Sequence, residues 1–76
     1  MATLDQLQPG QHGRIEALAG DPALVQRLYE IGLFEGEVAE VLGVSLLGDP
    51  IEIRVGNTRL SLRRAEAAVV TVTHLA

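Results

Sequence analysis

The chain of 76 residues has no cysteine, no lysine and no tryptophan, and it has only one tyrosine and one phenylalanine. Without cysteine it can form neither disulfide bonds nor thiolate metal sites. Without lysine it can support neither Schiff-base catalysis nor a Walker-type phosphate loop. Two serines and two histidines are present, but no G-x-S-x-G segment accompanies them. We therefore expect a protein that is not an enzyme, with an aliphatic core.

Charge and hydropathy limit the partners. The formal net charge is −4, and an acidic surface repels nucleic-acid phosphates and anionic lipid headgroups. No apolar run approaches the ~20 residues that a membrane-spanning helix needs. The opening MATLDQLQPG is polar and lacks the basic start of a signal peptide. We expect a cytoplasmic protein, a single domain over residues 1–76, that neither binds nucleic acid nor inserts into a membrane.

Alternating apolar and polar residues predict a mainly β chain. The five predicted strands cover residues 11–18, 37–44, 51–55, 58–62 and 69–73. In the first strand Ile15 and Ala17 share the inward face. Gly56 and Asn57 are typical of a two-residue hairpin turn between the third and fourth strands. The alternation in residues 37–44 is irregular, and a bulge near Glu40 would restore it.

One helix is predicted between the first two strands. Asp21 followed by Pro22 is a typical helix start, because Asp caps the helix and Pro fits its first position. The core-facing stripe of this helix is formed by Leu24, Leu28 and Ile31. Gly32 should end the helix in the left-handed conformation. Short helical turns are predicted at residues 3–7 and 63–67.

The size of the chain favours closure of the predicted sheet. Five short strands cannot bury one face as a flat sheet, so we expect a small five-stranded barrel with the helix over one open end. A domain this small often needs help from oligomerisation. A homo-oligomer is compatible with the sequence, which leaves the oligomeric state open.

Two long segments carry a family resemblance. They are GDPALVQRLYEIGLFEGEVAEVL at residues 20–42 and LGDPIEIRVGNTRLSLRRAEAAVVTV at residues 47–72. Together with the opening LDQLQPGQHGRI, they resemble the FeoA family, ferrous iron transport protein A, across nearly the whole chain. The likeness lies in the order and spacing of many weak features, since no single motif is specific.

The resemblance implies a Src-homology-3-like barrel with one inserted α-helix. It also implies an accessory role in ferrous iron transport beside FeoB, a membrane transporter with a cytosolic GTP-binding domain, and no cofactor. FeoA-like domains also end some metal-dependent repressors, but the chain has no helix-turn-helix segment, so a stand-alone accessory protein is expected. The alternatives are a sensor or chaperone that binds a transition-metal ion, and an interaction module for another partner.

Adjacent leucines give the first candidate interface. Leu46 and Leu47 fall in a predicted loop, where a small barrel cannot easily bury both, and exposed apolar pairs often mark contact sites. Val25 and Tyr29 flank the helix stripe and could extend that surface. The alternative is that the leucines plug the barrel mouth and that Tyr29 packs against the base of the helix.

Arg63 and Arg64, at the start of a predicted helical turn, are further candidates. An arginine supplied from outside can accelerate GTP hydrolysis by stabilising transition-state charge. The simpler interpretation is a surface ion pair with Glu66.

His12 and His74 are the only imidazoles and lie at strand ends. Strand parity puts them on opposite faces of the sheet, and two ligands fall short of the usual four of zinc. We therefore predict no metal site.

Overall fold

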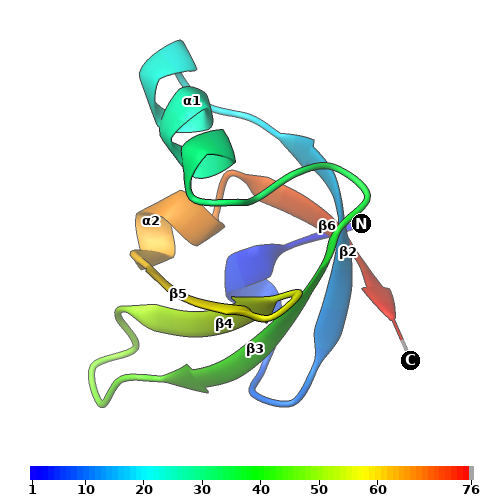
Figure 1. Ribbon diagram of the computed structural model, residues 1–76. Helices are drawn as coiled ribbons and strands as arrows, with labels where there is room; N and C mark the ends of the chain where they lie inside the picture. The colour runs from blue at the N-terminus through cyan, green and yellow to red at the C-terminus, as the bar shows by residue number, and fades with distance from the viewer. Residues whose placement is uncertain (76) are drawn as a thin grey trace.

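The computed structural model describes residues 1–75, and its main feature is one strongly curled antiparallel sheet (Figure 1). The strands are β1 (Ala2–Thr3), β2 (His12–Leu18), β3 (Val38–Val44), β4 (Ile51–Val55), β5 (Thr58–Leu62) and β6 (Val70–Leu75). The helical elements are a 3-10 turn η1 (Leu4–Gln6), the inserted helix α1 (Pro22–Glu30) and the single turn α2 (Arg64–Ala67). The predicted mainly β fold, with one inserted helix and short helical turns, is confirmed.

The strands are ordered β1-β6-β2-β3-β4-β5 within the sheet. All five predicted strands are present, and the sixth is the two-residue β1, which pairs with β6. Within residues 1–75 the edge strands β1 and β5 do not pair with each other, so the sheet curls without closing. The expected barrel is therefore an open one, because β1 and β5 each keep one unpaired edge.

A single aliphatic cluster fills the concave side of the curl. Strand β4 shows the simplest pattern, with Ile51, Ile53 and Val55 buried and the residues between them exposed. The largest fully buried side chains are Leu4, Ile15, Leu28, Leu33, Val41, Ile51, Ile53, Leu62, Val70 and Val72. No polar or charged side chain is buried in residues 1–75, so burial of aliphatic surface is the main stabilising term.

An unpredicted bulge in β2 makes one expectation about strand faces wrong, and the predicted bulge in β3 is present at a shifted position. In β2 the register shifts between Ile15 and Ala17, which leaves Ala17 exposed instead of inward. In β3 the register shifts between Val41 and Gly43, two residues beyond the predicted bulge near Glu40. Glu40 instead pairs in register with Arg54, to which its carboxylate also forms an ion pair.

Helix α1 begins as predicted and ends one residue early. The Asp21 carboxylate accepts a hydrogen bond from the Leu24 amide at 2.9 Å, which caps the helix. Gly32 adopts the predicted left-handed conformation, with φ of +107°. This turn directs Leu33 into the core and leaves Ile31 37% exposed, so the prediction that Ile31 lies in the core stripe is wrong.

Gly13 allows β2 to approach β6 closely. A Cβ at this position would lie 2.9 Å from the Val72 Cβ and 3.0 Å from the Leu7 Cδ1. We predict that Gly13→Ala lowers the free energy of unfolding by about 1–3 kcal/mol through overpacking. Chemical denaturation will measure this change in the free energy of unfolding. Gly43→Ala is the matched control, because a Cβ at Gly43 meets nothing within 4 Å; equal losses for the two variants would contradict the prediction.

Candidate functional site

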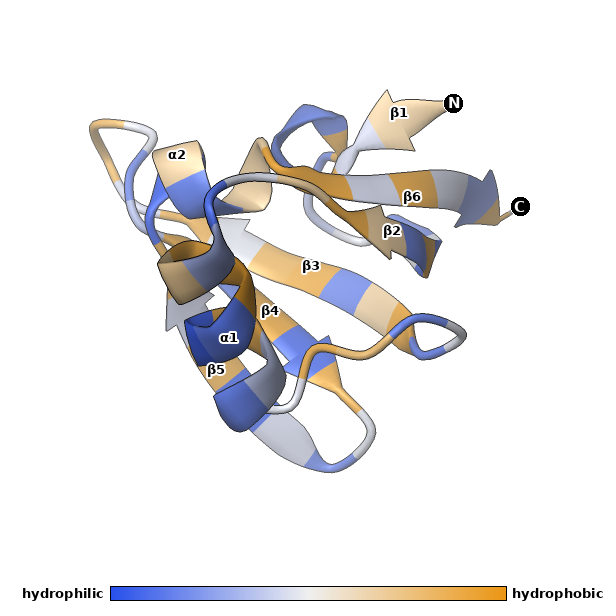
Figure 2. Ribbon diagram, turned by 90° about the horizontal axis from the view of Figure 1, so that it is seen from above, coloured by the Kyte–Doolittle hydropathy of each residue, from blue (hydrophilic) through white to orange (hydrophobic). Residues whose placement is uncertain are grey.

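The loop between β3 and β4, residues 45–50, projects from the sheet and exposes two leucines. Leu46 is 101% exposed and Leu47 is 93% exposed. Figure 2 shows the tip of this loop as a hydrophobic segment standing clear of the strands. The leucines therefore do not plug the mouth of the sheet, and we call residues 46–47 with their flanking turn the leucine loop.

The base of the leucine loop is closed by its own hydrogen bonds. The Gly48 amide donates to the Ser45 carbonyl at 2.8 Å, and the Asp49 amide donates to the Ser45 hydroxyl oxygen at 3.1 Å. The Ser45 amide donates to the Pro50 carbonyl at 3.2 Å. These contacts fix the backbone while the two leucine side chains remain in solvent.

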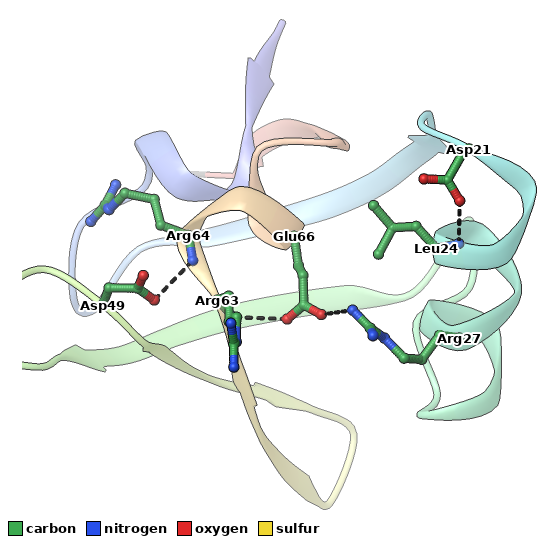
Figure 3. Close-up of polar contacts among 7 residues, drawn as sticks. All are labelled: Asp21, Leu24, Arg27, Asp49, Arg63, Arg64 and Glu66. Atoms are coloured by element: carbon green, nitrogen blue, oxygen red, sulfur yellow. Dashed lines mark hydrogen bonds and ion pairs between the residues drawn. The ribbon is translucent and has the colours of Figure 1, made fainter.

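Arg64 connects the leucine loop to the rest of the fold. Its Nε donates to the Gly48 carbonyl at 2.9 Å, and its Nη1 donates to the Asp5 carbonyl at 3.0 Å. Its backbone amide donates to the Asp49 Oδ1 at 3.0 Å (Figure 3). The guanidinium therefore bridges the loop and η1, a positioning role that the sequence did not indicate.

Arg63 is placed differently from its neighbour. Its backbone amide donates to the Glu66 carboxylate at 2.8 Å, and the other oxygen of that carboxylate pairs with Arg27 from α1 (Figure 3). The expected ion pair of Glu66 with Arg63 or Arg64 is therefore wrong, because Arg27 occupies that position. The Arg63 guanidinium has no hydrogen-bond acceptor among residues 1–75.

A groove of about 650 Å³ separates α1 from α2. The Arg27–Glu66 ion pair crosses it. Its lining residues are Asp21, Ala23, Leu24, Arg27, Arg63, Ala65 and Glu66. The groove contains both signs of charge and a small apolar floor, so by itself it favours no particular ligand.

Val25 and Tyr29 are half-buried on α1 and do not extend the leucine loop. Figure 1 shows α1 and the β3–β4 loop at opposite ends of the molecule. Tyr29 instead stacks on Phe34, with ring centroids 5.7 Å apart, and its hydroxyl donates to the Glu35 carboxylate at 2.8 Å. Phe34 was not among the predicted interface residues, and its neighbour Leu33 in the same short link is buried, so the local sequence carries no clear signal for its exposure.

The hydrogen bond between Tyr29 and Glu35 shifts the pKa of both side chains. Donation by the Tyr29 hydroxyl lowers the pKa of the Glu35 carboxyl, and a backbone hydrogen bond acts in the same direction. The same hydrogen bond raises the pKa of the Tyr29 hydroxyl, with smaller contributions from desolvation and the nearby Glu35 charge. Glu35 therefore keeps its negative charge at neutral pH.

Residues 2–74 match the family model of the FeoA domain. The chain belongs to the FeoA family. This family is linked to ferrous iron transport. The resemblance to FeoA that the sequence segments at residues 20–42 and 47–72 indicated is therefore confirmed. No curated protein sequence matches the chain. No helix within the described part of this FeoA protein is long and apolar enough to cross a bilayer.

Solved FeoA structures share the fold over nearly the whole chain. An iron uptake regulatory protein (FeoA) is 31% identical, with a TM-score of 0.87 and coverage of 97% of this chain and 96% of that one. FeoA from Chlorobium tepidum is 38% identical, with a TM-score of 0.90 and coverage of 97% and 70%. FeoA from Stenotrophomonas maltophilia, solved in complex with zinc and described as a prokaryotic SH3 domain protein, is 30% identical, with a TM-score of 0.77 and coverage of 96% and 91%.

A manganese-dependent transcriptional repressor contains the same fold. It is 19% identical with a TM-score of 0.90, and the match covers 97% of this chain but only 41% of the repressor. At this identity the likeness concerns the fold alone. The Src-homology-3-like architecture is therefore found both in FeoA proteins and in this repressor, as the sequence resemblance implied.

The two histidines of this FeoA protein lie on adjacent strands but point to different faces. His74 pairs with Gly13 across β6 and β2, whereas His12 pairs with Leu75. The His12 Nε2 lies 3.7 Å from the Glu40 carboxylate. Among residues 1–75 no three His, Asp or Glu side chains gather closely enough to hold a metal ion.

The Arg64 contacts predict a local effect in FeoA. We expect Arg64→Ala to speed hydrogen exchange at the Gly48 and Asp49 amides and to cost about 1–2 kcal/mol of stability, because two side-chain hydrogen bonds are lost. Exchange measured by NMR will test this. Arg59→Ala, on the exposed side of β5, is the control, and protection that is unchanged in Arg64→Ala would show that the loop closes without the arginine.

The Tyr29 contact predicts a change in titration. In Tyr29→Phe we expect the pKa of Glu35 to rise toward its ordinary value, as followed by carboxyl ¹³C NMR. Because the folded pKa is the lower one, the hydrogen bond stabilises the fold above the unfolded pKa of Glu35, and this contribution is lost as pH falls through the folded pKa. Phe34→Leu removes the ring stack but keeps the hydroxyl, so a similar rise in that control would exclude the hydroxyl as the cause.

Proposed function

We propose that this FeoA protein is a cytoplasmic, non-catalytic regulator of ferrous iron transport that acts by direct contact with the cytosolic part of the FeoB transporter. The observation that carries the proposal is the pair of exposed leucines on a loop whose base is fixed. The FeoA from Stenotrophomonas maltophilia, proposed as a ferrous iron transport activating factor, supports the same role.

The leucine loop has the properties of a contact site. Burying one leucine side chain contributes about 1.5–3 kcal/mol, so two adjacent ones can supply a large part of a binding energy. A loop that is already ordered loses less conformational entropy when it binds. The Ser45 and Arg64 contacts provide that order before any partner arrives.

A narrower hypothesis concerns the GTP-binding domain of FeoB. Arg64 is engaged by two backbone carbonyls, so it is a poor donor to an external phosphate. Arg63 is the arginine of this pair that could stabilise transition-state charge. If it does, adding the protein raises FeoB GTP turnover and Arg63→Ala abolishes the increase; no change on addition would exclude the role.

Direct metal sensing receives less support from the chain. His12 and His74 would have to meet across the sheet to share an ion, which the register of β2 and β6 does not allow. Isothermal titration of stripped protein with ferrous ion tests this alternative. Tight one-to-one binding that His12→Ala removes would favour metal sensing over partner contact.

The leucine loop gives a direct test of the proposal. We expect Leu46→Asp combined with Leu47→Asp to weaken binding to purified FeoB at least about tenfold, because truncating contact residues at an interface costs 1–2 kcal/mol or more. The far-UV circular dichroism and the melting temperature should stay unchanged, since both side chains are in solvent.

The matched control places the same two charges elsewhere. Asn57→Asp with Thr58→Asp adds them to the β4–β5 hairpin, at the other end of β4 from the leucine loop. FeoB binding that is weakened equally by both double variants would mean that charge alone is responsible. Unfolding of the leucine variant would mean that the leucines belong to the core.

A further inference from the structure

A second apolar surface lies where α1 turns into β3. Ile31 is 37% exposed, Phe34 is 48% exposed and Val38 is 39% exposed, and Phe34 is stacked against the half-buried Tyr29. We call Tyr29, Ile31, Phe34 and Val38 the junction patch. Figure 1 shows the link between α1 and β3 at the α1 end of the molecule, away from the β3–β4 loop, so the two surfaces are separate.

The junction patch is held in place before binding. The Gly36 amide donates to the Ile15 carbonyl at 2.7 Å, which attaches the link to β2. The Glu37 amide donates to the Phe34 carbonyl at 3.2 Å. The Tyr29–Glu35 hydrogen bond fixes the ring that supports Phe34. The exposed ring therefore lies on a rigid base, as in surfaces that bind with little loss of entropy.

Acidic residues are interspersed along the chain with those of the junction patch. Glu30, Glu35 and Glu37 are exposed, and none of the three has an ion-pair partner among residues 1–75. Figure 2 shows the link that follows α1 as a hydrophobic stretch and then a hydrophilic one, which contains Glu35 and Glu37. One cation, Arg14, is the cross-strand partner of Val38, and its guanidinium lies 4.0 Å from the Glu16 carboxylate.

The negative charge of this surface distinguishes between its possible binding partners. A second copy related by a two-fold axis would bring together two links that each carry three carboxylates and one neighbouring Arg14, and the excess of like charge opposes such a contact. An anionic bilayer would be repelled for the same reason. A segment with both apolar and basic side chains would bury the rings and neutralise the acidic rim.

We propose that the junction patch docks a basic, apolar segment that flanks a membrane span of a transporter. Loops on the cytoplasmic side of membrane proteins carry an excess of Lys and Arg close to the spans, which is the chemistry that this patch fits. The inference rests on the proposed cytoplasmic role, and it adds a second contact site with its own partner segment. A guanidinium over the exposed Phe34 ring would add a cation–π interaction.

Synthetic peptides covering the cytosolic span-flanking loops of FeoB provide the probe, with the same peptides carrying Gln at every Lys and Arg as controls. We expect one basic peptide to shift the ¹⁵N-protein amide signals of residues 29–38 and leave those of the leucine loop unchanged. Phe34→Ser should weaken this binding about tenfold, as loss of a central aromatic contact does. Glu35→Gln with Glu37→Gln should weaken this binding several-fold. Raising the salt concentration to about 0.5 M should also weaken it, because a shorter Debye length screens the attraction between the charges.

Several results would overturn the inference. The first two are a Gln peptide that binds as tightly as the basic peptide, and amide shifts that are scattered over the whole surface. The other two are peptide binding that Phe34→Ser leaves unchanged, and self-association in sedimentation experiments that Phe34→Ser abolishes. Failure of the two proposals can be distinguished. If full-length FeoB binds through the leucine loop but no peptide binds, only the junction-patch inference is removed. If a peptide binds but the leucine double variant leaves FeoB binding unchanged, only the leucine-loop contact is removed.

Discussion

One guanidinium connects the exposed loop to the start of the chain. Arg64 joins the Gly48 carbonyl of the leucine loop to the Asp5 carbonyl near the start of the chain, while its own amide is held by Asp49. A chain without cysteine has no covalent means of fixing a projecting loop. The planar, rigid fork of arginine can donate in two directions at once, which a lysine ammonium does less well. Loop, α2 and η1 are therefore positioned as a unit.

Sequence patterns predicted those parts of the fold that short-range chemistry determines. Alternation along β4, the Asp21 cap and the Gly56–Asn57 turn each involve residues within a few positions of one another. The left-handed Gly32 was predicted for the same reason. Exposure of Leu46 and Leu47 followed from a simple volume argument about a small core. These signals were sufficient to predict both the mainly β architecture and one of the candidate surfaces.

The remaining features depend on contacts that a local pattern does not contain. The bulge at Glu16 in β2 was not predicted, so strand parity alone misplaced Ala17, whereas the bulge in β3 was predicted two residues before its position. The core role of Leu33 in place of Ile31 depends on the direction of the chain after Gly32. The Arg64 contacts join residues up to 59 positions apart. Both the helix end and the loop anchor are decided by tertiary packing, which overrides local propensity.

The placement of the aromatic residues supports two docking surfaces instead of one. Tyr29 and Phe34 are the only aromatic side chains, and neither belongs to the aliphatic core. Their apolar area is therefore not needed to stabilise the fold, and aromatic rings are the side chains that most often dominate interfaces. The β3–β4 loop and the link that follows α1 lie at opposite ends of the molecule; the loop tip is hydrophobic, and the link contains Glu35 and Glu37 (Figures 1 and 2). If both contact one partner, each binding event raises the effective concentration for the other, so two individually weak contacts suffice for stable association.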